Sequence, residues 1–435
     1  MVFGNLLLLL LMWGVCIYIW NGRGINYVRL LQLQQTEFGN PRRGASHADV
    51  FNTVGDLIII YLLTFVLYNK LLRSGYIGAQ YTHLVPLLMT KYFIFRLVWP
   101  LNSREVWWSM LGRVLAAPFY PIIFRDGFIG DLLTSLVRVS VPMSYSVAYI
   151  AITLYGWLMN RMDLVMAISD EKWRHTALFK SYIIPFLTLF PLYVRLLQCL
   201  RRSVESGNRW PHMGNALKYT STILVLSFSI FQPRCRNSWY WIASFVAATL
   251  FQFLWDVFQD WGIVVIKYPD YLNAWQVVVT CSVRFQFRQQ KLLGPLYIYI
   301  AVIVSNLVLR FAWALTLLPP PIDLPSAGSD QPASGPVYVF LFTHAAPIAA
   351  SVEVLRRMVW GIFRLEQEQL EMLGDDTLLH SRDAVAASPS RSAADFEKVT
   401  TVYICSNYST NTFIVLETDC PFTTSRCPRG CPPPH

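Results

Sequence analysis

Apolar runs of about twenty residues recur along this chain, and they constrain its fold more than any other feature. A helix of about twenty residues crosses the ~30 Å hydrocarbon core of a bilayer. Only 14% of the 435 residues are charged, whereas soluble proteins carry about 25%. Backbone polar groups must be satisfied inside lipid, and the runs lack the alternation of barrel strands. The sequence therefore predicts an all-α polytopic membrane protein.

About ten transmembrane helices are expected. They cover residues 3–20, 54–72, 83–100, 105–124, 131–158, 176–199, 213–232, 238–258, 294–318 and 336–362. After residue 371 the chain becomes rich in Ser, Thr, Asp, Ala and Pro, which predicts a mostly disordered C-terminal tail over 372–435. Lys and Arg in loops 200–212 and 259–293 favour a cytosolic C-terminus, whereas four arginines in loop 21–53 favour the opposite orientation for the N-terminal half.

Ionisable residues inside the predicted spans are the most informative side chains, because a charge at the bilayer centre is costly unless it meets a partner or a wet cavity. Four acids lie at this depth: Asp131, Asp256, Asp260 and Glu353. Ten cations accompany them: Lys91, Arg96, Arg113, Arg138, Lys180, Arg195, Lys218, Arg310, Arg356 and Arg357. Four acids do not neutralise ten cations, so some cations must reach an interface or face a bound anion.

Helical spacing groups several of these residues. Asn215, Lys218 and Tyr219 share one face, and Arg310 shares a face with Trp313. Glu353 precedes Arg356 and Arg357 by three and four residues, so it can hold one guanidinium in place. Asp256 and Asp260 are four residues apart and repel each other unless a cation lies between them.

Clustered Arg and Lys with hydrogen-bonding neighbours suit an oxyanion, because guanidinium matches phosphate or sulfate oxygens. The alternative is that these cations are span-end anchors and structural ion pairs. We expect that alternative for Lys91, Arg96, Arg113, Arg138 and Lys180. For the other five cations, the residues alone leave both interpretations open.

Other functional classes have weaker support in the sequence. Nucleic-acid binding is not expected, since the positive charges behind the net charge of +10 are spread along the chain and partly within apolar runs. His344 is the one candidate for a membrane enzyme, and no convincing catalytic partner accompanies it. The eight cysteines show no paired metal-binding spacing, and we assign no metal site to Cys427 and Cys431. No ATP-binding loop is present, which argues against a primary pump.

Five blocks in order resemble the EXS-domain family of phosphate exporters, which includes the xenotropic and polytropic retrovirus receptor, the plant PHO-type exporters and the yeast ER-retention-defective protein. The blocks are Pro191–Arg202 (PLYVRLLQCLRR), Pro211–Tyr219 (PHMGNALKY), Trp255–Gly262 (WDVFQDWG), Leu309–Trp313 (LRFAW) and Glu353–Glu368 (EVLRRMVWGIFRLEQE). The resemblance implies a phosphate exporter without a cofactor, whose last six helices form the transport bundle. It divides the chain into about four N-terminal helices (1–125), an EXS domain (126–371) and the tail.

The resemblance also implies residue roles. The residues expected to contact phosphate are Arg195, Lys218, Tyr219, Arg310, Arg356 and Arg357. Those expected to orient them or line the pathway are Asp131, Thr134, Asn215, Asp256, Asp260, Trp313 and Glu353. Two positions depart from the family pattern: Thr134 and Gly361 stand where Asn is usual. Thr134 can still form a hydrogen bond, whereas Gly361 affects local helix packing.

This chain resembles the short branch of the family that lacks the SPX sensor domain, because its first span begins by residue 3. That branch implies a Golgi membrane, where glycosylation releases phosphate into the lumen. The expected partners are therefore inorganic phosphate and the lipid bilayer, with a homodimer left open. The competing hypothesis is a membrane protein that interacts with the Golgi retention machinery and keeps glycosyltransferases in place without transport of its own.

Overall fold

A computed structural model describes most of the membrane-embedded part of the chain. The residues described are 2–33, 36–37, 40–41, 47–74, 84–99, 101–161, 163, 176–232, 235, 238–267, 284–312, 314, 336–386, 403–406 and 413–416. Trp313, Cys427 and Cys431 lie outside them, as does most of the predicted disordered tail.

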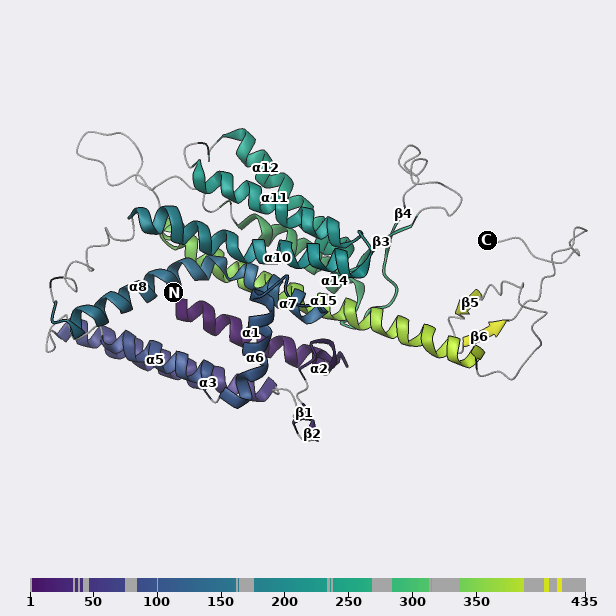
Figure 1. The fold of residues 1–435 in the computed structure, drawn as a ribbon, viewed down its shortest axis with the longest axis horizontal. Helices are drawn as coiled ribbons and strands as arrows, with labels where there is room; N and C mark the ends of the chain where they lie inside the picture. Colours follow the sequence, from purple (N-terminus) through teal and green to yellow (C-terminus); the bar gives the residue numbers. More distant parts are fainter. Residues whose placement is uncertain are drawn as a thin grey trace, which may run out of the picture. The chain divides into compact units, whose positions relative to one another are not determined.

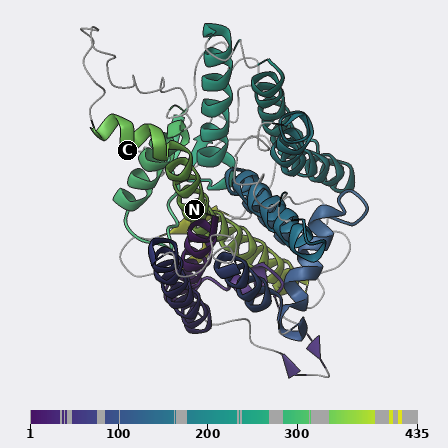
Figure 2. The ribbon, with the colours of Figure 1, turned by 90° about the vertical axis from the view of Figure 1, so that its left-hand side faces the viewer.

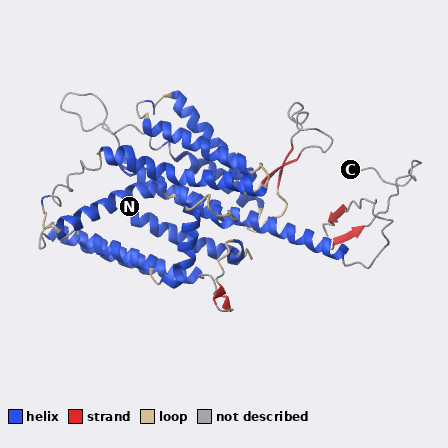
Figure 3. Cartoon of the chain, in the orientation of Figure 1, coloured by secondary structure: helices blue, strands red, loops and turns tan. Residues whose placement is uncertain are grey.

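Helices make up nearly all of the described structure (Figures 1 and 3). In chain order they are α1 (Val2–Gly22), α2 (Tyr27–Leu30), α3 (His47–Ser74), α5 (Leu84–Val98), α6 (Leu101–Leu115), α7 (Phe124–Ser135), α8 (Val137–Leu158), the π-helix η2 (Leu178–Ile183), α10 (Ile184–Ser206), α11 (His212–Phe231), α12 (Trp239–Trp255), the π-helix η4 (Asp256–Asp260), α14 (Leu296–Arg310) and α15 (Pro336–Ala386).

The described strands form three short antiparallel hairpins (Figure 3). Their strands are β1 (Thr36–Glu37) with β2 (Asn40–Pro41), β3 (Val264–Lys267) with β4 (Arg284–Phe287), and β5 (Tyr403–Ser406) with β6 (Phe413–Leu416). In β3–β4, Val264 lies opposite Phe287 and Lys267 opposite Arg284.

The predicted all-α membrane architecture is confirmed, and each of the ten predicted spans falls on helical structure. Among the described residues, five helical segments are long and apolar enough to cross a membrane. They are Phe3–Gly22, His47–Ser74, Val137–Leu158, Leu178–Ser206 and Trp239–Asp260. The shorter apolar helix Leu296–Arg310 accompanies them.

Two predicted boundaries differ from the structure. The span drawn to residue 124 ends at Leu115, because Pro118 and Pro121 follow and proline cannot continue a helix. The span 131–158 consists of the end of α7 and all of α8. The Ser135 hydroxyl donates to the carbonyl oxygen of Leu132 at 2.6 Å, and the Leu136 N–H donates to that of Leu133 at 3.1 Å. These bonds interrupt the i to i−4 hydrogen bonding of the helix.

The last helix continues beyond its predicted end at residue 362. Its later turns are polar but carry pairs at i, i+4: Arg364 lies 3.2 Å from Glu368, and the Gln367 amide donates to Glu371 at 2.8 Å. Such pairs support a helix outside the apolar core.

The chain divides into two compact units, Met1–Met372 and Leu373–His435. In the first unit α10 packs against α11, α7 and α8, while α11 packs against α12. In Figure 2 the teal helices of this group lie apart from the purple N-terminal helices, among which α1 packs on α3. The main apolar core joins residues from both ends of the unit, including Trp20, Phe128, Trp261, Tyr299 and Leu365. This core fixes the position of α15 relative to α7 and α14.

Candidate anion-binding site

A cavity of about 370 Å³ lies within the first unit, lined by α7, α8, α10, α11, α12, η4, α14 and α15. Among its described lining residues are two carboxylates, Asp256 and Glu353. Its described cations are Arg138, Lys218, Arg310, Arg356 and Arg357. The surface of this cavity therefore carries more positive than negative charge.

Arg195 belongs to a buried ion pair beside the cavity. Its Nε and Nη2 donate to the two oxygens of Asp131 at 3.0 and 2.9 Å, and its Nη1 donates to Gln198 at 2.5 Å. The Tyr219 hydroxyl also donates to Asp131. Gly130 permits this arrangement, because a Cβ there would lie 2.5 Å from the Arg195 side chain. Arg195 and Asp131 do not line the cavity, whereas Tyr219 does.

Lys218 projects from α11 and lines the cavity. Its ammonium lies 3.7 Å from Asp260, beyond hydrogen-bond distance, and over the rings of Tyr219 at 4.9 Å and Trp255 at 5.7 Å. Gly214, one turn earlier, brings α11 close to Trp255, since a Cβ there would lie 2.6 Å from that ring. The lysine is thus only 6% exposed, yet its one described carboxylate partner is distant.

The two acids of η4 take different partners. Asp256 accepts from Asn306 at 2.9 Å and pairs with Arg310, whereas Asp260 faces Lys218 and accepts from the Trp360 indole at 3.2 Å. The repulsion expected between two acids four residues apart is therefore relieved by two separate cations rather than by one between them.

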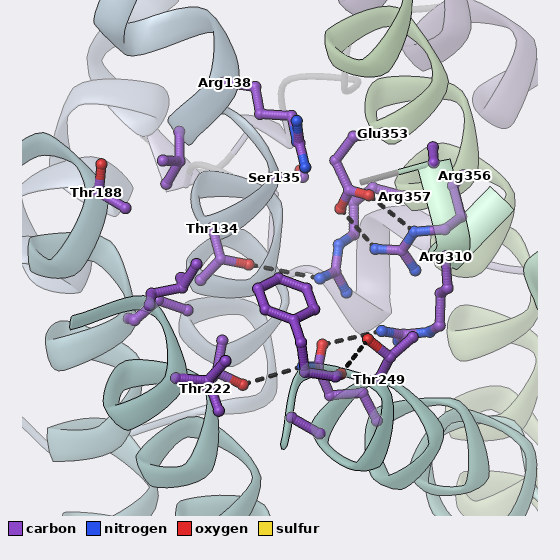
Figure 4. Close-up of a pocket in the computed structure, with 18 of the residues that line it drawn as sticks. Thr134, Ser135, Arg138, Thr188, Thr222, Thr249, Arg310, Glu353, Arg356 and Arg357 are labelled. Atoms are coloured by element: carbon purple, nitrogen blue, oxygen red, sulfur yellow. Dashed lines mark hydrogen bonds and ion pairs between the residues drawn. The ribbon is translucent and has the colours of Figure 1, made fainter. Parts of the chain in front are cut away.

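Arg310 and Arg356 are held by carboxylates (Figure 4). Arg310 donates to Asp256 through Nε at 3.2 Å and also through Nη2. Arg356 donates to both oxygens of Glu353 at 2.9 and 2.6 Å, and to Asn306 at 3.2 Å. These bonds fix both guanidinium groups at the cavity wall.

Arg357 forms fewer hydrogen bonds to protein groups than Arg310 and Arg356 do. Its Nη2 lies 3.4 Å from the Thr134 hydroxyl (Figure 4). Its guanidinium lies 4.7 Å from the centre of the Trp360 ring. Its Nε is buried without a hydrogen-bond partner, and among the described residues it forms no ion pair with a carboxylate. We call Lys218 and Arg357 the open cations, and Arg195, Arg310 and Arg356 the paired cations.

Hydroxyl groups around the cavity mostly point at the backbone. Thr222 donates to the carbonyl of Lys218 at 2.8 Å, and Thr134 donates to that of Asp131 at 2.7 Å. Their oxygens then accept, from Gln252 at 3.0 Å and from Arg357. These hydroxyls therefore hold donors in place.

The structure does not bring every predicted residue into the cavity. The Asn215 Oδ1 is buried without a hydrogen-bond partner and does not line it, and Trp313 lies outside the described residues. His344 is exposed on α15 and does not line it either. Arg96 pairs with Asp56 at 2.9 Å, as expected for a structural ion pair.

Two polar residues that the sequence analysis passed over, Gln252 and Asn306, take part in the site, together with one cation that it had classed as an anchor. Arg138, expected to be an anchor, lines the cavity. Gln252 accepts from Arg310 at 2.9 Å, and Asn306 links Asp256 to Arg356. Gln252 precedes Asp256 by four residues, and Asn306 precedes Arg310 by four, so extending the same-face rule to uncharged polar residues would have found both.

Comparison with known proteins matches the EXS family to residues 1–370 of this chain. The match begins at residue 1 and so includes the N-terminal helices, which the five sequence blocks do not reach. The family match thus extends over nearly all of the first compact unit.

Several relatives align with most of the chain. SPX and EXS domain-containing protein 1 of Dictyostelium discoideum is 29% identical over 372 residues, covering 82% of this chain and 35% of that protein. Solute carrier family 53 member 1 of Homo sapiens is 26% identical over 383 residues, covering 83% and 48%. The xenotropic and polytropic retrovirus receptor 1 homolog of Danio rerio is 28% identical over 373 residues, covering 83% and 48%. The chain matches a third to a half of the length of these relatives.

Proposed function

This chain belongs to the EXS family, and we propose that it carries inorganic phosphate across a membrane through the cavity lined by Lys218, Arg310, Arg356 and Arg357. One observation carries the proposal: a cavity among membrane-spanning helices has more cations than carboxylates on its wall. Uncompensated charge inside a bilayer is costly, so a mobile anion is the natural complement.

Charge counting supports an oxyanion of low charge. With Asp131, Asp260 and Arg195 behind the wall, and with Arg138 left out of the count, the described cluster holds five cations and four carboxylates, an excess of one positive charge. Singly charged inorganic phosphate, which is abundant near neutral pH, would balance this excess. A volume of about 370 Å³ also leaves room for several waters around the ion, since a water occupies about 30 Å³.

The contacts suggest different roles for the open cations and the paired cations. The open cations, Lys218 and Arg357, have donors free for phosphate, and Arg357 offers the planar fork that suits two oxygens. Arg310 and Arg356 contribute positive potential from fixed positions and use most of their donors on protein oxygens. Arg195 and Asp131 brace Tyr219 at the wall. Partial contacts of this kind permit release as well as binding.

We further propose a Golgi membrane and movement from lumen to cytosol, as implied by the family resemblance. Basic loops 200–212 and 259–293 support a cytosolic side at the ends of α10 and η4. Locating the tagged chain by immunofluorescence beside Golgi markers tests the compartment, and protease protection of a tag in either loop tests the orientation.

The decisive experiment is flux of radiolabelled phosphate from proteoliposomes that contain the purified chain, with sulfate as competitor. We expect saturable flux whose half-saturation constant Arg357→Gln raises roughly 10- to 150-fold. Arg201→Gln is the matched control, because Arg201 pairs with Glu205 near the end of α10 and does not line the cavity. Absence of flux from folded protein would reject transport and favour the retention hypothesis.

A further inference from the structure

A second hollow, of about 750 Å³, lies where α1 ends and α3 and α14 begin. Its lining is largely apolar and comes from four helices (α1, α3, α14 and α15), the residue after α1 and the segment before α14. The apolar lining residues are Ile19, Leu293, Ile298, Val302, Ile362 and Phe363. We call this hollow the α1–α14 groove. It shares no lining residue with the cationic cavity.

The rim of the groove is polar and carries positive charge. Arg23 follows α1 directly, is exposed, and forms no ion pair among the described residues. His47 is the first residue of α3, and its Nδ1 is buried without a hydrogen-bond partner. The N-terminus of this 28-residue helix adds N–H groups that have no acceptor within the helix itself, and a partial positive charge. Asp49, on the same turn, is exposed and does not line the groove.

The ends of the surrounding helices lead us to place the groove at the level of a membrane interface. The apolar span of α1 ends at Gly22, one residue before Arg23. Tyr18 and Tyr297, near the ends of α1 and α14, are 62% and 70% exposed. Exposed tyrosines gather where hydrocarbon meets the headgroups. The apolar wall therefore lies at the depth of the lipid acyl chains, and the rim lies at the depth of the headgroup phosphates.

We propose that the α1–α14 groove binds an anionic glycerophospholipid, with its headgroup phosphate on Arg23 and His47 and an acyl chain along Ile298 and Val302. Charge complementarity selects the headgroup, because the described rim offers cationic and N–H donors without a lining carboxylate. The apolar wall selects a lipid over a free phosphate ion, which would gain nothing from burying those side chains. A volume of about 750 Å³ is within the roughly 300–1,000 Å³ range of small-molecule pockets, so the groove would hold the headgroup and part of one acyl chain.

The position along the chain suits this ligand. Leu293 of the groove is the last residue of loop 259–293, whose basic residues favour the cytosolic side. Anionic phospholipids are concentrated in cytosolic leaflets. The groove also borders α15 at Ile362 and Phe363, within two turns of Arg357.

The test is native mass spectrometry of the purified full chain after exchange into an equimolar mixture of phosphatidylcholine and phosphatidic acid. We expect retention of phosphatidic acid over phosphatidylcholine, and a loss of about tenfold in that preference for Arg23→Ala with His47→Gln. Val302→Trp should fill the groove and remove retention of both lipids without altering charge. Arg29→Ala is the control, since Arg29 is exposed nearby on α2 and does not line the groove.

Equal retention of the two lipids would overturn the proposal, as would retention that survives both Val302→Trp and the rim variant. Cross-linking of two chains through Ile298→Cys would assign the groove to a second copy and overturn it as well. Melting temperature and gel filtration of each variant show that it is folded. Lipid retention is measured without phosphate flux, so it stands apart from the outcome of the transport experiment.

Discussion

The paired and open cations share one buried cluster but differ in how their charge is balanced. Arg195 and Arg356 each meet a carboxylate through two hydrogen bonds, and Arg310 does so at Asp256. Lys218 reaches Asp260 only at 3.7 Å, and Arg357 meets a hydroxyl and a ring. Burial of a charge is costly unless it is paired. The charges of the paired cations are therefore satisfied within the fold. Lys218 forms only the longer ion pair with Asp260, and Arg357 forms none with a described carboxylate, so both retain donors that an anion can occupy.

The largest expected effect is the loss of stability when a paired cation loses its carboxylate. Asp131→Ala leaves Arg195 buried without its carboxylate, and we expect the free energy of unfolding to fall by about 3–5 kcal/mol. The melting temperature of the purified variant in detergent measures this loss. The double variant Asp131→Leu with Arg195→Met should recover most of it, because it removes both charges together. A single variant as stable as the parent would show that the pair is not a structural element.

Substitution of an open cation should have the opposite pattern, with little effect on stability and a large effect on phosphate binding. Arg357→Gln removes no ion pair with a described residue, so we expect the unfolding free energy to change by less than about 1 kcal/mol. Loss of charged hydrogen bonds to phosphate should weaken binding by about 1.5–3 kcal/mol, or roughly 10- to 150-fold. The half-saturation constant of flux and isothermal titration with phosphate measure it. A variant that loses stability but binds phosphate normally would erase the distinction between open and paired cations.

The sequence predicted the helical membrane fold and the charged residues, because a bilayer imposes a span length and a cost on each buried charge. Contacts within one helix were equally predictable, as Glu353 with Arg356 shows. Contacts between helices were not. No spacing rule reveals that Asp131 meets Arg195 across 64 positions, or that Arg357 lacks a described carboxylate. Those facts depend on packing between α7, α10 and α15, including the close approach at Gly130.

Arg310→Lys sharpens the comparison by keeping charge while changing geometry. Lysine lacks the planar fork that reaches Asp256 and Gln252 together, so we expect a loss of about 0.5–1.5 kcal/mol of stability, the value of one hydrogen bond. Flux should persist at a reduced rate, because the positive potential remains. Lys218→Arg is the counterpart on the open side and should retain stability. Complete loss of flux in Arg310→Lys would mean that Arg310 contacts phosphate through its fork.

The smallest effect should follow Gly361→Ala, which would act on Arg357, an open cation, through the rings of Phe128 and Trp360. A Cβ at Gly361 would lie 3.1 Å from Cζ of Phe128, whose ring stacks on Trp360 at 5.7 Å. Arg357 in turn lies over Trp360. Alanine favours the helix over glycine by about 0.5–1 kcal/mol, which offsets the displacement of Phe128. We therefore expect a melting temperature near that of the parent and a shift of less than about threefold in half-saturation, equivalent to about 0.6 kcal/mol. A larger shift without loss of stability would show that the Phe128–Trp360 stack positions Arg357 for phosphate.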